Sequence, residues 1–152
     1  MPLVSPVIDP LEAMLALARA DTGLASVTSN QIARKHKFKA GAQSQSSWKT
    51  PSKALVIRYD VGGQQDIYVS NQCVRLAAEC YGEDESQAGL VYTGLIALFR
   101  VDDRRVVTTR NGQALIYWVV PDGTPLSSRN EDIKQDFIGV PLKICVAEQP
   151  VG

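Results

Sequence analysis

Two adjoining stretches in the middle of the chain alternate apolar and polar side chains with the period of a half-buried β-strand. In the first stretch, 55–61, the apolar side of the alternation consists of Leu55, Ile57, Tyr59 and Val61. The second begins near Gln65, bends at Ser70-Asn71 and continues to Tyr81, and its inward residues are Val74, Leu76, Ala78 and Cys80. Gly62-Gly63 lies between the stretches and tolerates positive φ, so it can close a tight hairpin. We therefore predict two paired antiparallel strands.

A helix is predicted on each side of this strand pair. Asp9-Pro10-Leu11-Glu12 supplies a capping acceptor and a proline at the first helical position, which predicts a helix over Pro10 to Ala20 that stops before Thr22-Gly23. A short extended piece is expected at Val27 to Ile32. The second helix begins after Asp84, with Gln87 placed as in a capping box. Its apolar positions recur at helical spacing and are Ala88, Val91, Tyr92, Leu95, Leu98 and Phe99.

The last third of the chain is predicted to be rich in strands. Strands at 106–109 and 114–120 flank an Asn-Gly pair, which is a strong signal for a hairpin. The segment 121–125 contains two prolines and a glycine and breaks the chain. A final strand is expected at 133–146, with core residues Phe137, Leu142, Ile144 and Val146. Because Pro141 has no N–H for a ladder, this strand must be bulged or lie at an edge there.

These elements predict one α+β domain spanning 1–152, in which two helices cover one face of a mainly antiparallel sheet. The segment 33–52 departs from this plan, because apolar residues are scarce along it and Gly, Ser and Gln accumulate around Trp48. Loops of this length are usually functional or disordered, so this one is a candidate arm. Trp48 either tucks back against the domain or anchors an interface, since tryptophan is enriched among residues that dominate binding energy.

The same loop begins with a basic run whose cationic residues are Arg34, Lys35, His36, Lys37 and Lys39. Such a run can follow a phosphate backbone. However, 16 basic residues balance 16 acidic ones, so the chain has no global field that would hold it on nucleic acid or an anionic membrane. Specific DNA recognition is not expected, and non-specific contact with DNA passing nearby is left open.

The residues offer no set of groups suited to catalysis or metal binding. His36 is the single histidine and has no cysteine or carboxylate at ligand spacing. Glu83-Asp84-Glu85 is explained by its position at a helix start, where acidic groups oppose the positive end of the dipole. Asp102-Asp103 is compensated by Arg104-Arg105. We therefore expect no enzyme, no metal and no cofactor.

The three cysteines are Cys73, Cys80 and Cys145, and all lie in apolar strand patterns. They are interpreted as buried free thiols in a reducing cytosol. Cys73 and Cys80 fall on opposite faces of one strand, so they should not bond to each other. The amino terminus lacks a secretory signal and no apolar run approaches the ~20 residues of a membrane span. The chain is expected to be soluble and intracellular when made, with no membrane contact.

The order of these elements resembles the tail terminator family of tailed bacteriophages, also called tail completion or minor tail proteins. The resemblance covers most of the chain and is carried by the helix from Asp9 to Ala20, the polar loop, the strand 56–59, the segment 74–82 leading into a helix at 86–92, and the late strand 136–140. It has no signature motif. The basic loop, the segment 39–52 and Pro141 have no counterpart in the family pattern.

The resemblance implies copies that close into a ring, a hexamer, on the head-proximal end of a finished tail tube. Such a ring stops tube polymerisation and presents a surface to the head connector, at the neck of the virion, after synthesis in the host cytoplasm. In that setting Arg34, Lys35, Lys37 and Lys39 would face DNA in the lumen or an acidic neighbour. The loop around Trp48 would dock on an adjacent subunit or on the tube. Two alternatives remain: a head completion or connector protein, and a small nucleic-acid-binding module.

Overall fold

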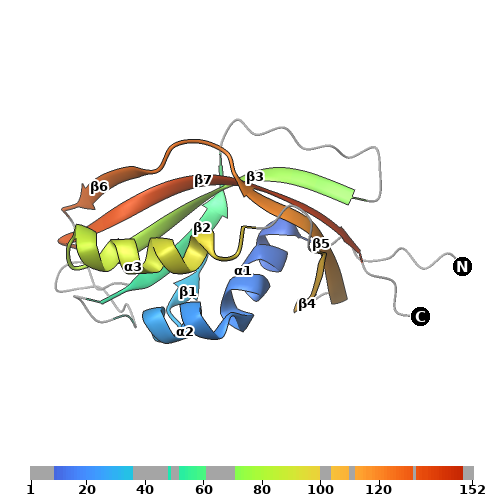
Figure 1. The fold of residues 1–152 in the computed structure, drawn as a ribbon, viewed down its shortest axis with the longest axis horizontal. Helices are drawn as coiled ribbons and strands as arrows, with labels where there is room; N and C mark the ends of the chain where they lie inside the picture. The colour runs from blue at the N-terminus through green and yellow to red at the C-terminus, as the bar shows by residue number, and fades with distance from the viewer. Residues whose placement is uncertain are drawn as a thin grey trace, which may run out of the picture.

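The computed structural model describes residues 9–35, 48, 52–60, 71–99, 104–109, 112–131 and 133–148. These residues form an α+β fold in which a seven-stranded sheet is strongly curled and accompanied by three helices (Figure 1). The elements are α1 (Pro10–Ala20), α2 (Thr22–Thr28), β1 (Ile32–Ala33), β2 (Ala54–Tyr59), β3 (Asn71–Gly82), α3 (Glu85–Ile96), β4 (Arg105–Thr109), β5 (Gly112–Pro121), β6 (Leu126–Asn130) and β7 (Gln135–Glu148).

The strands follow the order β1-β2-β3-β7-β5-β4. Strand β6 also pairs with β7, at a different part of β7 from the part that pairs with β5. Every pair is antiparallel except β1 and β2, which run parallel, so the sheet is mixed. A parallel pair needs a long connection between its strands, and residues 34–53 provide one. The mainly antiparallel sheet predicted from the sequence therefore gains a parallel strand at one edge.

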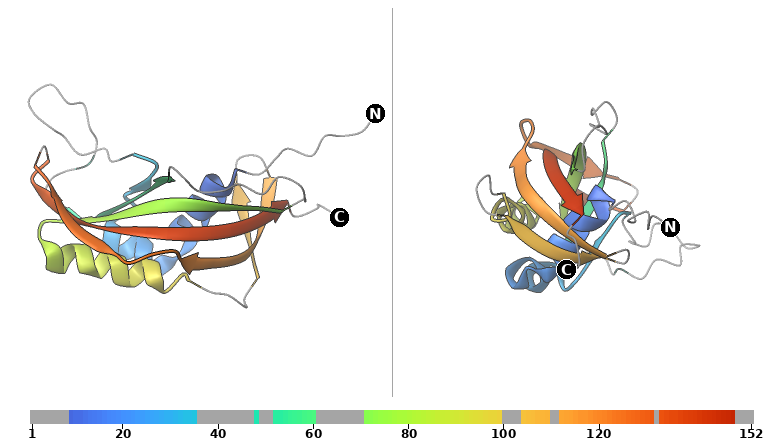
Figure 2. Two further views of the ribbon diagram at one scale, coloured as in Figure 1. Left: turned by 90° about the horizontal axis from the view of Figure 1, so that it is seen from above. Right: turned by 90° about the vertical axis from the view of Figure 1, so that its right-hand side faces the viewer.

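The main core joins all three helices to one set of alternating strand residues. In β3 this set is Val74, Leu76, Ala78 and Cys80, as predicted. Three helices rather than the expected two accompany the sheet, and because the sheet is strongly curled they do not form a simple layer over a flat face. Helices α1 and α3 both contact β3 and β7, and α1 also contacts β1, β2 and β4. Figure 2 shows the sheet curving over the helices, which explains how they reach different strands.

Helix α1 has the predicted bounds, and the Asp9 side chain accepts a hydrogen bond from the Leu11 amide at 2.9 Å. Helix α2 was not predicted, and the extended piece expected at Val27 to Ile32 is wrong for Val27 and Thr28, which are helical. Asp21 caps α2 by accepting from Leu24 N, so the chain contains a second helix start directly after α1. Because Thr, Gly and Val are poor helix formers, the residue pattern at 22–28 did not indicate a helix.

Helix α3 and the two predicted strand pairs are confirmed. Asp84 caps α3 through the Gln87 amide, at 2.9 Å. Strands β2 and β3 pair antiparallel, and β4 pairs with β5 so that Thr109 lies opposite Gly112. The hairpin residues themselves, 62–63 and 110–111, lie outside the described residues, as does Val61. Tyr59 was predicted to face the core and is exposed instead.

Strand β7 is central in the sheet, but at Pro141 one of its sides has no strand partner, so the prediction of a bulge or an edge at this residue is confirmed locally. On one side β7 pairs with β3 along its length, and Pro141 lies opposite Ala77. On the other side β5 ends at Pro121 and β6 begins at Leu126. The Pro141 carbonyl accepts from Asp122 N at 2.9 Å in this break. The missing N–H of Pro141 therefore falls where no strand is paired on that side.

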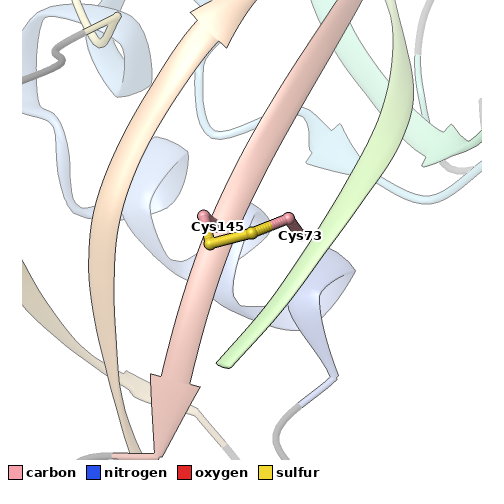
Figure 3. Close-up of a disulfide and its surroundings, with 2 residues drawn as sticks. All are labelled: Cys73 and Cys145. Carbon is pink, nitrogen blue, oxygen red and sulfur yellow. A yellow bond between two sulfur atoms is a disulfide. The ribbon is translucent and has the colours of Figure 1, made fainter. Parts of the chain in front are cut away.

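Two of the three cysteines form a disulfide, which corrects the prediction of three free thiols. Cys73 on β3 and Cys145 on β7 are directly opposite each other, with Cα atoms 4.0 Å apart, and their sulfurs are bonded (Figure 3). The β3–β7 register brings them together, and spacing in the sequence did not reveal that register. Cys80 is free and buried, so the prediction that it does not bond to Cys73 is confirmed.

Candidate assembly surface

A groove lies on the face of the sheet that points away from the main core. Because side chains alternate along a strand, the β3 residues between the core positions point to this outer face, and they include Ala77 and Glu79. Together with Phe137 and Pro141 of β7 and Leu126 of β6, they line a groove of about 470 Å³. Most of this lining is apolar. We call it the outer-face groove.

Two glycines shape this groove. Gly123 has φ +150°, and a Cβ at this position would lie 2.7 Å from Pro141 Cγ, so only a glycine allows the chain to cross so close to Pro141. Gly139 contributes no side chain to the floor, and a Cβ there would be in ordinary van der Waals contact with the Leu126 carbonyl oxygen at 3.8 Å. Leu126 itself is 72% exposed, which is unusual for a large apolar side chain at the rim of an apolar hollow.

Ion pairs within the chain neutralise the charged rim of the groove. Arg75 Nε lies 2.9 Å from Asp60 Oδ2 and 3.5 Å from Asp122 Oδ2. Arg58 Nε lies 3.7 Å from Glu79 Oε1. These side chains are partly exposed, so each pair adds little to stability. The two arginines at the rim are therefore already paired with carboxylates of their own chain.

Trp48 packs in a second, smaller core cluster, where it is 9% exposed. Its neighbours in the cluster include Val56, Tyr81 and Phe137, and the Tyr81 and Phe137 ring centroids are 5.3 Å apart. Burial raises the pKa of Tyr81 to about 12, so its hydroxyl is protonated at neutral pH. This position matches the alternative in which the loop tucks Trp48 back against the domain. Whether it also anchors a neighbour stays a prediction.

Arg34 lies beside the start of α1. Its Nη2 atom is 2.6 Å from both Asp9 Oδ2 and Glu12 Oε1, and the Tyr59 hydroxyl donates to Asp9 as well. Partial burial by itself would raise the pKa of the Asp9 carboxyl. The hydrogen bonds from Tyr59 and Arg34 lower this pKa by more than burial raises it, so the pKa of Asp9 is below its ordinary value. The charge of Arg34 is thus matched within its own chain.

The other predicted basic residues are only partly described. Lys35 is exposed directly after Arg34. His36, Lys37 and Lys39 lie outside the described residues. Of the predicted interaction residues, the structure therefore places Arg34 against α1 and Trp48 in the second cluster, and it does not show the basic residues gathered into one surface.

The sequence analysis missed two surfaces, the outer-face groove and the exposed side of α3. The groove combines residues from β2, β3, β6 and β7, so no pattern within a single segment of the sequence indicates it. The exposed side of α3 had a readable signal, because the run 86–99 contains no charged residue although 21% of the chain is charged. An exposed helix usually carries charge on its solvent side.

Among the residues that the structure describes, no group of three or more His, Cys, Asp and Glu side chains is placed to hold a metal ion. The helices in this part of the chain are too short or too polar to cross a membrane.

No family model matches the chain, and no curated protein matches it. Among solved structures, the fold is similar to that of a chain in a structure described as the virion of a native gene transfer agent particle. The TM-score is 0.61 at 13% sequence identity, and the alignment covers 93% of this chain and 98% of the other. At this identity the likeness shows a shared fold, and it extends along nearly the whole of both chains.

Proposed function

We propose that this chain is a structural protein of a phage-like particle and, within it, the tail terminator. One observation carries the proposal: nearly the whole chain shares its fold with nearly the whole of a chain from a gene transfer agent virion. The order of elements predicted from the sequence also resembles that of tail terminators, and this resemblance supports the finer part of the proposal.

In this role, copies of the chain close into a hexameric ring on the head-proximal end of the tail tube. The ring stops tube polymerisation and offers its other side to the head connector at the neck. A ring of identical subunits needs two different surfaces on each copy, one for each neighbour. Such a role needs no catalytic site, so the proposed protein is a non-enzymatic one.

The basic residues of the loop face either DNA in the lumen or an acidic neighbour in this proposal. Because Arg34 is already paired with Asp9 and Glu12, the contact depends mainly on Lys35, Lys37 and Lys39. Replacing these three lysines with alanine is expected to leave the fold intact and impair head–tail joining. If the triple variant joins heads to tails as the wild type does, the hypothesis that the loop lysines make this contact is wrong.

Trp48 is proposed to help dock the loop on an adjacent subunit or the tube, in addition to its packing in the second cluster. Trp48→Ala is expected to impair ring assembly and tail joining. Trp48→Phe serves as a control that keeps an aromatic ring in the cluster. If the alanine variant is folded and assembles like the wild type, the anchor hypothesis fails and only the packing role remains.

Electron microscopy of particles made without this gene tests the proposal directly. Tails of uncontrolled length with no heads attached are the expected result. Tails of normal length beside full, unjoined heads would instead identify a head completion or connector protein, the second candidate. Intact infectious particles would rule out both roles.

The third candidate, a small nucleic-acid-binding module, makes a different prediction. Neutralising phosphates with several lysines releases counterions, so binding to arbitrary duplex DNA would fall steeply with salt. The neutral total charge favours the structural role. A steep salt dependence measured with the isolated protein would reverse that preference.

A further inference from the structure

Beyond Glu85 in its first turn, the exposed side of helix α3 carries no charge. Ala88, Val91 and Leu95 pack into the main core. On the opposite side Leu90 is 51% exposed, Ile96 is also exposed, and the run 86–99 contains no Asp, Glu, Lys, Arg or His. Exposed Ser86 and Thr93 are the polar residues beside them, and an uncharged side with exposed apolar residues is a candidate contact with another molecule. We call it the α3 face.

A helix face without charge can bind favourably only to partner surfaces of certain chemistry. A charge placed against it would lose its hydration without gaining a counter-ion, which is unfavourable. A suitable partner surface is therefore apolar, or has charges that are already paired. The outer-face groove meets both conditions, since its floor is formed by Ala77, Gly139 and Pro141, and Arg75 on its rim is paired with acidic residues of its own chain.

The two surfaces also match in shape. The α3 face is convex, and Gly89 on this helix has nothing within 4 Å of an added Cβ, so a neighbouring backbone can approach closely. The groove is concave, and its volume of about 470 Å³, with no side chain at Gly139, leaves room for an incoming side chain. Transfer of a leucine side chain of the α3 face from water into such an apolar hollow is favourable.

We propose that the α3 face of one copy seats in the outer-face groove of a neighbouring copy, with Leu90 directed toward Gly139. The proposal rests on the proposed function, which requires the chain to bind further copies of itself. It adds the identity of the two surfaces that make this contact.

The positions of the two surfaces favour a closed ring. Helix α3 packs on the sheet face that carries Leu76 and Ala78, whereas the groove lies on the face that carries Ala77 and Glu79. Each copy can therefore bind one neighbour through α3 and the other through the groove. A contact between two different surfaces is heterologous, and it generates a ring when its rotation closes.

Two substitutions test the contact from its two sides. Leu90→Arg puts a charge into the interface while keeping a good helix former. Gly139→Val fills the floor of the groove, where the nearest atom to the new Cβ is 3.8 Å away, with a residue that suits a strand. Val106→Arg is the control, because Val106 is 50% exposed but lies on β4, outside both surfaces.

Sedimentation and native mass spectrometry of the full chain measure the effect, with circular dichroism to verify folding. Each test variant is expected to weaken self-association by about tenfold or more, and the control is expected to behave like the wild type. Rings that persist in both test variants would overturn this contact and leave the proposed function standing. A wild-type chain that forms no ring either alone or on isolated tails would overturn both.

Cysteine pairing provides a positive test of the same contact. Leu90→Cys chains mixed with Gly139→Cys chains are expected to form a disulfide-linked dimer under mild oxidation, since such a bond needs Cα atoms within about 7 Å. Val106→Cys in place of either partner should give none. A dimer yield no higher with the Leu90 and Gly139 pair than with this control would contradict the proposal.

Discussion

At the residue scale, Gly82 joins β3 to α3 with no room for a side chain. A Cβ at this position would lie 2.3 Å from Ala88 N and 2.6 Å from Gln87 C, and backbone atoms cannot move aside without displacing the first turn of α3. Gly82→Ala is therefore expected to lower the free energy of unfolding by about 1–3 kcal/mol, measured by urea denaturation.

Gly89 gives the matched control within the same helix. Nothing lies within 4 Å of a Cβ there, so Gly89→Ala should raise the free energy of unfolding by about 0.5–1 kcal/mol through helix propensity alone. Similar effects of the two alanines would show that the close approach at Gly82 is not what requires glycine.

Asp9 links stability to pH, because its pKa is lower in the folded chain than its ordinary value of 3.8. The charged form is favoured by folding, so its contribution is fully present above that ordinary pKa and is lost as the pH falls through the folded value. Asp9→Asn keeps a good capping acceptor and removes the charge. We expect the variant to lose less stability on acidification below about pH 4 than the wild type.

Urea unfolding at a series of acidic pH values measures this difference. The Tyr59→Phe variant offers a second test, since it removes one of the two side chains that donate to Asp9. It should shift the acid loss of stability toward higher pH. Parallel curves for the wild type and both variants would mean that the Asp9 cluster does not contribute to the pH dependence.

At the element scale, the disulfide ties β3 to β7 across 72 residues of sequence. Closing a loop of that length in the unfolded chain corresponds to about 4 kcal/mol of stabilisation in the chain-entropy account. Cys73→Ala/Cys145→Ala is expected to lower the free energy of unfolding and to make it insensitive to reductant. Thiol titration of the denatured wild-type protein should detect Cys80 alone, and three reactive thiols would contradict the bond.

The elements predicted correctly from sequence are those determined by a few neighbouring residues. Asp9-Pro10 and Asp84 fix the starts of α1 and α3, and the Asn111-Gly112 pair indicates the β4–β5 turn. The missed elements depend on distant contacts. Helix α2 packs Leu24 against α3, where a Cβ on Gly94 would lie 2.8 Å from Leu24 Cδ1. Strand β6 exposes nearly all its side chains and gains its partner only from β7.

The candidate surfaces were less predictable than the fold, for the same reason. Trp48 stood out as a large ring in a polar loop, but the sequence could not say that Val56 and Tyr81 would cover it. The groove floor at Gly139 lies beside Leu126 only because β6 and β7 pair in that register. Cys73 and Cys145 became partners through the β3–β7 register in the same way.

At the scale of the whole molecule, β7 organises the sheet. It pairs with the full length of β3 on one side and with β5 and β6 on the other. The β3 partners are distant in sequence, with Gly82 opposite Asp136 and Asn71 opposite Ala147. Folding must close these long loops before the pairing contributes stability, so stopped-flow refolding is expected to take from roughly milliseconds to seconds. Refolding within microseconds would contradict this dependence on long-range pairing.

The buried thiol of Cys80 makes the folded chain convenient for site-specific labelling. Burial, with a smaller effect from Glu79, raises the pKa of the Cys80 thiol, and Cys73 and Cys145 are held in their disulfide. Since the thiolate is the reactive form, none of the three native cysteines should react with a maleimide at neutral pH. A fluorophore attached to one introduced surface cysteine would therefore report from a single known position, without prior removal of the native cysteines.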